Sequence, residues 1–214
     1  MLRNRTDAGR LLLNEITKRG ANKRISFLFA IPRGGVEVAF PIASGVRKQI
    51  IPIVVHKIPA SYNKELAIGA VSQFGDTHFN DLAEIETKSY IEKALKETMR
   101  EINDRIKKFG VNFDFSNIKD KEILIVDDGI ATGETIYLAT KSLIKFEPSA
   151  IFIAVPVSSA EGFEKLSSIA KVISLIVDRY FYSVSSYYEE FSQLSEEKTQ
   201  FYISESSKFA TRGT

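Results

Sequence analysis

Short hydrophobic runs alternate with longer amphipathic segments along most of the chain. Five compact runs, each too short for a buried helix, are typical of strands buried on both faces; they cover residues 25–31, 50–55, 122–126, 150–155 and 172–177. Apolar residues at helical spacing predict the helices between them, at residues 10–19, 36–46, 87–109, 135–146 and 159–168. Since parallel strands need a crossover helix, the order predicts an α/β fold with a doubly wound, mainly parallel five-stranded sheet.

Two stretches interrupt this alternation. Residues 58–80 are polar and contain glycine, with one short apolar patch, so we expect a flexible, functional loop. The tail after Asp178 is rich in Tyr, Phe, Ser and Glu. We therefore expect a single domain with a core at about residues 20–178 and a tail at 179–214. At the other end of the chain, Asp7 is the expected N-cap of the first helix.

Composition narrows the class of protein. The 214 residues suit one α/β domain, and 44% hydrophobic with 26% charged residues is ordinary for a soluble chain. A net charge of +2 gives no general attraction to nucleic acid, and the absence of cysteine excludes disulfides and thiolate metal sites. No membrane-length apolar run or signal-like N-terminus is seen, so we expect a cytoplasmic protein without a membrane or nucleic-acid partner.

The strand predicted at residues 122–126 runs into a motif suited to phosphate. Asp127 and Asp128 follow it, and a turn of small residues then leads into a helix. Backbone N–H groups at a helix N-terminus are unpaired and carry positive potential, so this turn is a candidate phosphate site to which Thr132 and Thr135 add hydroxyls. The two carboxylates can bind ribose hydroxyls, or water on a magnesium ion.

This order of a hydrophobic strand, two acidic residues and a Thr-Gly-x-Thr turn resembles the signature of the type I phosphoribosyltransferases. The resemblance implies their fold, with a small hood beside the core sheet to which residues 179–214 contribute. It places Asp127 and Asp128 against the ribose hydroxyls of phosphoribosyl pyrophosphate (PRPP), with Mg²⁺ carried by PRPP and water. It also implies a 5-phosphate loop made of Gly129, Ala131, Thr132, Gly133, Glu134 and Thr135.

Further basic and glycine residues follow the first two predicted strands. Arg33, Gly34 and Gly35 come after the first, where glycines permit close backbone approach and the guanidinium offers a fork to phosphate oxygens. Lys57 follows the second strand, and Lys64 lies in the long loop. The resemblance implies that these five residues bind pyrophosphate, although Lys64 is equally typical of an incidental surface lysine. Residues 59–71 particularly resemble a poorly characterised prokaryotic branch of the family.

The reaction implied by the resemblance is transfer of ribose 5-phosphate from PRPP to a nucleobase, giving a nucleoside monophosphate and pyrophosphate. Arg33, Lys57 and Asp128 are the candidate catalytic residues. In the tail, Tyr180 or Phe181 is the candidate for stacking on the base, and the aromatic character favours a purine, as in salvage. Clustered aromatic residues are also typical of a hood core or a dimer contact. Because homodimers are common in the family, the resemblance implies a homodimer.

Several residues leave alternatives open. Many 6-oxopurine transferases carry aspartate where this chain has Ala131, which weakens a hypoxanthine or guanine assignment. Glu134 would cost on the order of 1 kcal/mol beside a phosphate, so we expect its side chain to face outward. His56 suits a structural role better than acid–base chemistry, and the sequence suggests no partner for His78. The rival function is a non-catalytic sensor of PRPP or a nucleotide; an amine acceptor is a further alternative.

Overall fold

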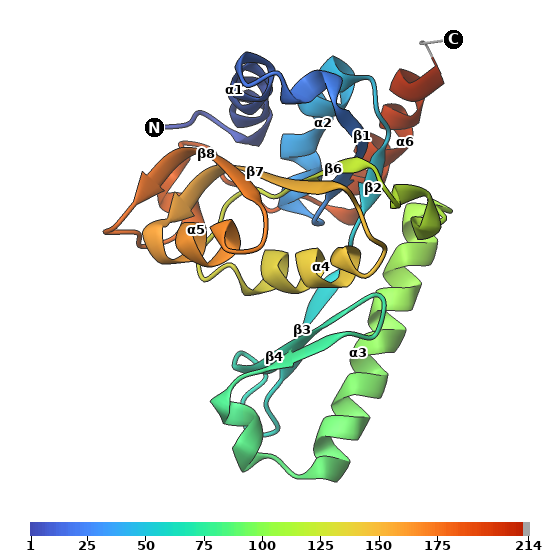
Figure 1. Ribbon diagram of the computed structural model, residues 1–214. Helices are drawn as coiled ribbons and strands as arrows, with labels where there is room; N and C mark the ends of the chain where they lie inside the picture. Colours follow the sequence, from blue (N-terminus) through green and yellow to red (C-terminus); the bar gives the residue numbers. More distant parts are fainter. Residues whose placement is uncertain (212–214) are drawn as a thin grey trace.

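Five parallel strands form the central sheet in the computed structural model of the protein, which describes residues 1–211 (Figure 1). In spatial order they are β2 (Ile50–Pro52), β1 (Ile25–Ala30), β6 (Glu122–Val126), β7 (Ala150–Ser159) and β8 (Lys171–Asp178). Leu28 and Phe29, neighbours on β1, are both fully buried and belong to different core clusters. The sheet is thus buried on both faces, and the predicted parallel α/β fold is confirmed.

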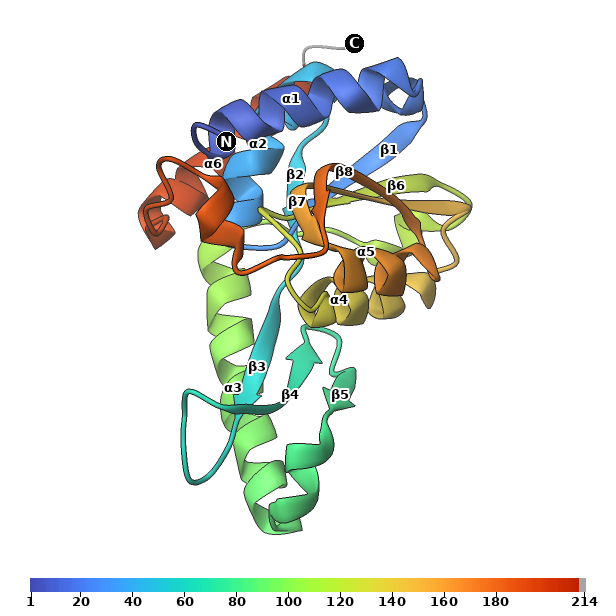
Figure 2. The ribbon, with the colours of Figure 1, turned by 90° about the vertical axis from the view of Figure 1, so that its left-hand side faces the viewer.

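Helices cover both faces of this sheet (Figure 2). One face carries α1 (Arg5–Lys18), α2 (Gly34–Val46) and α6 (Glu196–Thr211), and the other carries α4 (Glu134–Ile144) and α5 (Ala160–Ser167). On the first face Leu12 and Ile203 pack in the cluster that includes Leu28, while on the second Ile136 and Leu166 pack in the cluster that includes Phe29. This two-sided packing leaves the carboxyl ends of the strands as the open edge where ligands bind in such folds.

A smaller lobe extends away from the central sheet (Figure 1). It contains an antiparallel sheet of β3 (Val55–Pro59), β4 (Ala67–Ser72) and β5 (Thr77–Phe79), the turn η2 (Asp81–Ile85) and the long helix α3 (Lys88–Phe109). The side chain of Thr87 caps α3 by accepting a hydrogen bond from the Tyr90 N–H, and Gly110 ends the helix with φ 65°. The helix predicted at residues 87–109 is thus confirmed.

The small lobe corrects two predictions. The strand expected at residues 50–55 ends at Pro52, and Val55 begins a separate strand in the other sheet. The loop expected at residues 58–80 contains β4 and β5, because pairing with β3 satisfies the backbone and buries the apolar patch around Ile68. Gly69 fits this pairing since a Cβ there would lie 2.4 Å from the carbonyl oxygen of His78.

The two ends of the chain also differ from expectation. Asn4, rather than Asp7, caps α1, and its side chain accepts a hydrogen bond from the Asp7 N–H. Helix α6 packs against α2 and β2, with Tyr202 against Phe40, so residues 196–211 cover the core and do not form a hood. The remaining short helices are η1 (Ala21–Lys23), η3 (Phe115–Ile118) and η4 (Val184–Tyr187).

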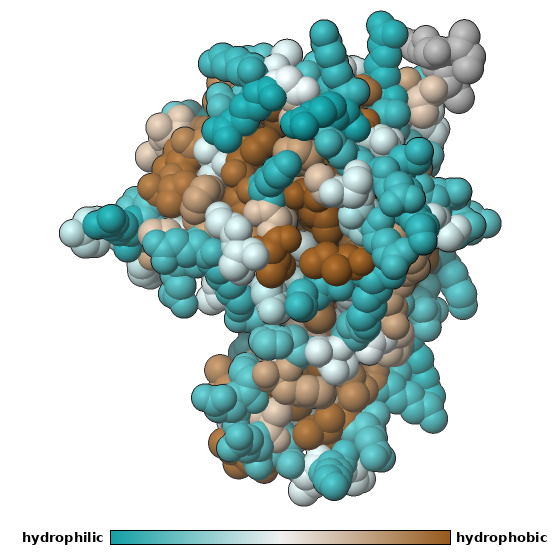
Figure 3. All heavy atoms as spheres, viewed as in Figure 1, coloured by the Kyte–Doolittle hydropathy of each residue, from teal (hydrophilic) through white to brown (hydrophobic). Residues whose placement is uncertain are grey.

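The surface shows no continuous apolar belt on the face viewed in Figure 3, where hydrophobic residues appear in separate patches on the core and on the small lobe. Within residues 1–211, no helix is both long enough and apolar enough to cross a membrane.

Candidate active site

The predicted phosphate loop connects the end of β6 to the start of α4. Gly133 takes a left-handed conformation, with φ 76°, and is the N-cap residue of α4. Strand β7 supports the loop from behind: the Ile130 N–H donates to the Val157 carbonyl at 2.9 Å, and the Ser159 hydroxyl donates to the Ala131 carbonyl at 2.5 Å. These bonds fix the turn against the sheet. Thr132 remains exposed, so a ligand can reach the turn.

The acidic pair lies directly against the Arg33-Gly34-Gly35 turn at the start of α2. A Cβ on Gly35 would lie 2.8 Å from the Asp127 Cα, and a Cβ on Gly34 would lie 1.9 Å from Asp128 Oδ2. Both glycines therefore allow an approach that a larger residue would block. Arg33, which is half-buried, precedes α2 as its N-cap residue. The structure thus brings together two motifs that are separated by about 90 positions in the sequence.

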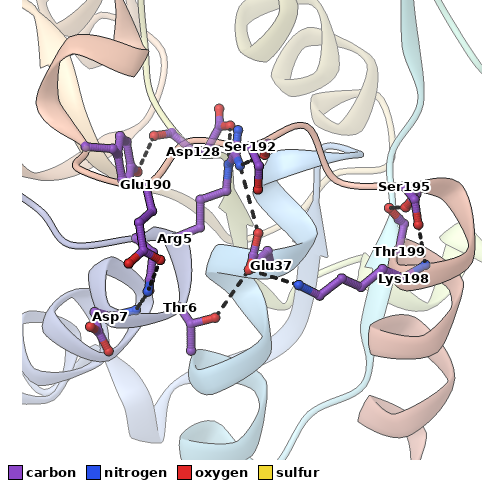
Figure 4. A network of polar contacts seen from close by, with 12 residues as sticks. Arg5, Thr6, Asp7, Glu37, Asp128, Glu190, Ser192, Ser195, Lys198 and Thr199 are labelled. Atoms are coloured by element: carbon purple, nitrogen blue, oxygen red, sulfur yellow. Dashed lines mark hydrogen bonds and ion pairs between the residues drawn. The ribbon is translucent and has the colours of Figure 1, made fainter.

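The electrostatics of the acidic pair are unusual. Burial and the adjacent Asp128 carboxylate raise the pKa of Asp127 well above its usual range, and Asp127 Oδ1 accepts a hydrogen bond from the Asp128 N–H at 2.8 Å. Burial also raises the pKa of Asp128, although Arg5 opposes this by pairing with Asp128 Oδ2 at 2.8 Å. Figure 4 shows that Arg5 reaches this carboxylate from α1. No spacing or motif in the sequence connected Arg5 to the site.

Lys57 lies beside the phosphate loop, although it belongs to the small lobe. Its side chain is exposed on β3 and lines a cavity of about 360 Å³ together with Thr132, Glu134 and Thr135. It also lines a cavity of about 190 Å³ formed mainly by the loop itself. Lys64 lines a third cavity, of about 440 Å³, that Lys57 shares and that lies against α3. Lys57 is thus placed at the junction of the three cavities.

Glu134 does not simply face solvent, as the sequence led us to expect. Its half-exposed carboxylate pairs with the ammonium group of Lys165, and its Oε2 lies 3.3 Å from His78 Nε2 on β5. The ammonium group of Lys165 balances the negative charge of Glu134, and the second contact gives His78 the partner that the sequence did not reveal. His56 contacts Arg105 of α3 at 2.6 Å, and burial together with this guanidinium lowers its pKa.

The aromatic tail is only partly engaged. Tyr180 is 93% exposed, and Phe181 stacks on Tyr187 with ring centroids 5.4 Å apart, so their role toward a base stays a prediction. Val184 is a lining residue that the sequence analysis missed. It borders the 190 Å³ cavity, and a Cβ on Gly129 would lie 2.6 Å from its side chain. A single valine in a polar tail carries no sequence signal that would have identified it.

The acidic pair does not by itself make a metal cage. Among residues 1–211, no group of three or more His, Cys, Asp or Glu side chains could hold a metal ion, and Arg5 pairs with one oxygen, Oδ2, of the Asp128 carboxylate. This donor set fits a magnesium ion that arrives on substrate oxygens and water better than one bound permanently by the protein.

A parallel sheet with an acidic pair and a Gly/Thr phosphate loop at its carboxyl edge defines a type I phosphoribosyltransferase. The chain belongs to this family: the family model named phosphoribosyl transferase domain matches residues 2–190. A protein from two strains of Mycobacterium tuberculosis is similar to this chain, and its name assigns it provisionally to the phosphoribosyl transferases. The two sequences are 27% identical over 200 residues, which cover 91% of this chain. The chain spans 44% of the length of those relatives.

A solved structure shows the same architecture. The crystal structure of TT1426 from Thermus thermophilus is similar, with a TM-score of 0.75 and 27% sequence identity, over 95% of this chain and 98% of that one. A purine phosphoribosyltransferase from Pyrococcus horikoshii matches with a TM-score of 0.49 and 15% identity, over 88% of this chain and 91% of that one.

Proposed function

We propose that the protein transfers ribose 5-phosphate from PRPP to a nucleobase, releasing pyrophosphate and a nucleoside monophosphate. The observation that carries this proposal is the meeting of three separate motifs. The Gly34-Gly35 turn packs on Asp127 and Asp128, and Lys57 borders the same cavities as the phosphate loop. A molecule with a phosphate at one end and a pyrophosphate at the other suits such a site.

The sugar half of PRPP would bind at the phosphate loop. The N–H groups of residues 131–135 and the hydroxyls of Thr132 and Thr135 receive the 5-phosphate, where the N-terminus of α4 adds positive potential. Asp127 and Asp128 accept hydrogen bonds from the ribose hydroxyls at the end of β6. These contacts fix carbon 1 of the ribose in place, so that an acceptor meets it in line.

The leaving group would bind at the other side of the acidic pair. As the bond to carbon 1 breaks, negative charge develops on pyrophosphate, and Arg33 and Lys57 stabilise it together with the N–H groups of Gly34 and Gly35. Lys64 belongs to the turn at residues 60–66, and closure of that turn would bring its ammonium group to pyrophosphate and exclude water. Magnesium bound to PRPP would neutralise part of the pyrophosphate charge.

The acceptor is proposed to be a purine. Tyr180 and Phe181 follow β8 at the carboxyl edge of the sheet, and an aromatic face there can stack on a base. Ala131 leaves the phosphate loop without the carboxylate that many 6-oxopurine enzymes carry. Adenine is therefore the first base to test, ahead of hypoxanthine and guanine.

The test is direct turnover. The protein is incubated with Mg²⁺, PRPP and each nucleobase in turn, and pyrophosphate release is measured alongside nucleotide formation. We expect one base to be consumed, and we expect Thr132→Ala to lower kcat/KM for PRPP at least tenfold because it removes a hydroxyl from the 5-phosphate site. Thr17→Ala, an exposed threonine on α1, is the matched control and should match the unaltered protein.

Two results would contradict the proposal. Tight binding of PRPP with no base consumed would favour a sensor of PRPP over a transferase. Unchanged kinetics in Thr132→Ala would show that the 5-phosphate binds elsewhere.

A further inference from the structure

Arg5 is a deeply buried cation beside the acidic pair. Only 7% of the residue is exposed, although it stands at the first position of α1. Its Nε donates to Asp128 Oδ2 at 2.8 Å across a sequence separation of 123 residues. Burying a guanidinium is costly unless its hydrogen-bonding groups and charge are compensated, so the contacts around it define its role.

These contacts surround the guanidinium (Figure 4). Its Nη1 donates to the Ser192 carbonyl at 2.7 Å and lies 3.9 Å from the Glu37 carboxylate of α2. The ring of Phe191 covers its flat face, with the guanidinium carbon 3.7 Å from the ring centroid. Hydrogen bonds from two edges of one planar group, together with stacking on an aromatic ring, can be made by the guanidinium of arginine. A lysine at this position could replace only the positive charge.

The tail also contacts Asp128 directly. The Tyr188 hydroxyl donates to the Asp128 backbone carbonyl at 2.7 Å. The same stretch is bound to the N-terminus, where the Leu2 N–H donates to the Tyr187 carbonyl at 2.8 Å and the Glu189 N–H donates to the Leu2 carbonyl at 2.9 Å. The first residues of the chain and residues 187–192 together close around the second carboxylate of the motif.

We propose that Arg5 is a positioning residue for PRPP binding: it holds the Asp128 carboxylate through Oδ2, so that Oδ1 is presented to a ribose hydroxyl. The inference rests on the proposed function, which places Asp128 at the ribose. Two adjacent carboxylates repel each other, and Glu37 adds a third negative charge nearby, so a fixed guanidinium is needed to hold Asp128 in one orientation. Substrate binding then requires no rearrangement of this carboxylate.

A plain structural role for Arg5 predicts a different result in a binding experiment. Loss of a structural strut lowers the fraction of folded protein, and hence the number of binding sites per chain, but leaves the Kd of the folded molecules unchanged. Loss of a positioning contact raises the Kd while the number of sites stays near one. Calorimetric titration with PRPP and Mg²⁺ reports both quantities and needs no acceptor base.

The variants are Arg5→Met and Arg5→Lys, with Arg10→Met as the matched control on the same helix, since Arg10 is exposed and pairs only locally with Asp7. We expect Arg5→Met to raise the Kd for PRPP at least tenfold with about one site per chain. Arg5→Lys should recover part of this loss, because its charge can still meet Asp128. Arg10→Met should bind as the unaltered protein does.

The outcomes are separable. An unchanged Kd in Arg5→Met overturns the inference, and so does a reduced number of sites at unchanged Kd. If Arg5→Met does not fold, Arg5→Lys decides: a Kd raised at least threefold supports positioning, and an unchanged Kd overturns it. Absence of PRPP binding by the unaltered protein would instead contradict the proposed function, and the inference with it.

Discussion

Gly35 is a position at which the two halves of the proposed donor site pack backbone against backbone. A methyl group there would lie 2.7 Å from the Val126 carbonyl oxygen and 2.8 Å from the Asp127 Cα, and both of these atoms belong to the backbone of β6 and its end. Neither can turn aside as a flexible side chain would. Gly35→Ala must therefore move the start of α2 away from the acidic pair.

The magnitude follows from two opposing terms. Overpacking of a tight interior site costs about 1–3 kcal/mol. Replacing glycine by alanine in a helix returns roughly 0.5–1 kcal/mol through backbone entropy and helix propensity. The net loss in the free energy of unfolding is then about 0–2.5 kcal/mol, centred near 1 kcal/mol, and each kcal/mol lowers the Tm of a chain of this size by about 2–4 °C. Displacement of Arg33 and Gly34 should in addition raise the Kd of the folded protein for PRPP, which a loss of stability alone leaves unchanged.

The assay combines thermal unfolding with PRPP titration. Gly45→Ala is the matched control, because Gly45 lies on the same helix and a methyl group there meets the side chain of Leu13, at 2.4 Å. A flexible side chain can shift, so Gly45→Ala should keep its PRPP affinity and most of its stability. If Gly35→Ala binds PRPP as tightly as Gly45→Ala does, the close packing of the two motifs has no role in the site.

Two further predictions concern charged groups around the site. Because burial and Arg105 hold the pKa of His56 below its ordinary value, the unfolded chain takes up a proton that the folded one resists, and stability is lost as the pH falls below about 6.5. The Tm of His56→Gln should therefore fall less than that of the unaltered protein between about pH 7.5 and 5.5; equal falls would contradict this. Lys165→Met should free Glu134 to repel the 5-phosphate, weakening PRPP binding about fivefold. The double variant with Glu134→Gln should restore it, and failure to do so would show that Lys165 acts otherwise.

The central sheet could be predicted because its signal is local. Strands β2, β1, β6 and β7 are largely buried, on both faces as Leu28 and Phe29 show for β1, so each appears in the sequence as a compact apolar run. The position of the loop at residues 127–135 could be predicted for the same reason, because it lies between a strand end and a helix start that the sequence itself indicates. Its role toward phosphate stays a prediction.

Three of the features that the sequence did not reveal depend on distant partners. The strand around Ile68 is short and interrupted by Gly69, and only its pairing with β3 and β5 makes it a strand. Arg5 looks like one more charge in a polar N-terminus until Asp128 and Phe191 enclose it. Glu134 likewise acquires its role from Lys165, on a helix further along the chain. Periodicity carries no information about such pairings.

In the proposed donor site, the phosphate loop and the Arg33–Gly35 turn form one site for one molecule of PRPP. Equilibrium binding of PRPP to the unaltered protein, in competition with ribose 5-phosphate and with pyrophosphate separately, tests it most directly. We expect a single PRPP site per chain, from which ribose 5-phosphate and pyrophosphate each displace PRPP. Absence of PRPP binding, or displacement by only one of the two, would contradict it.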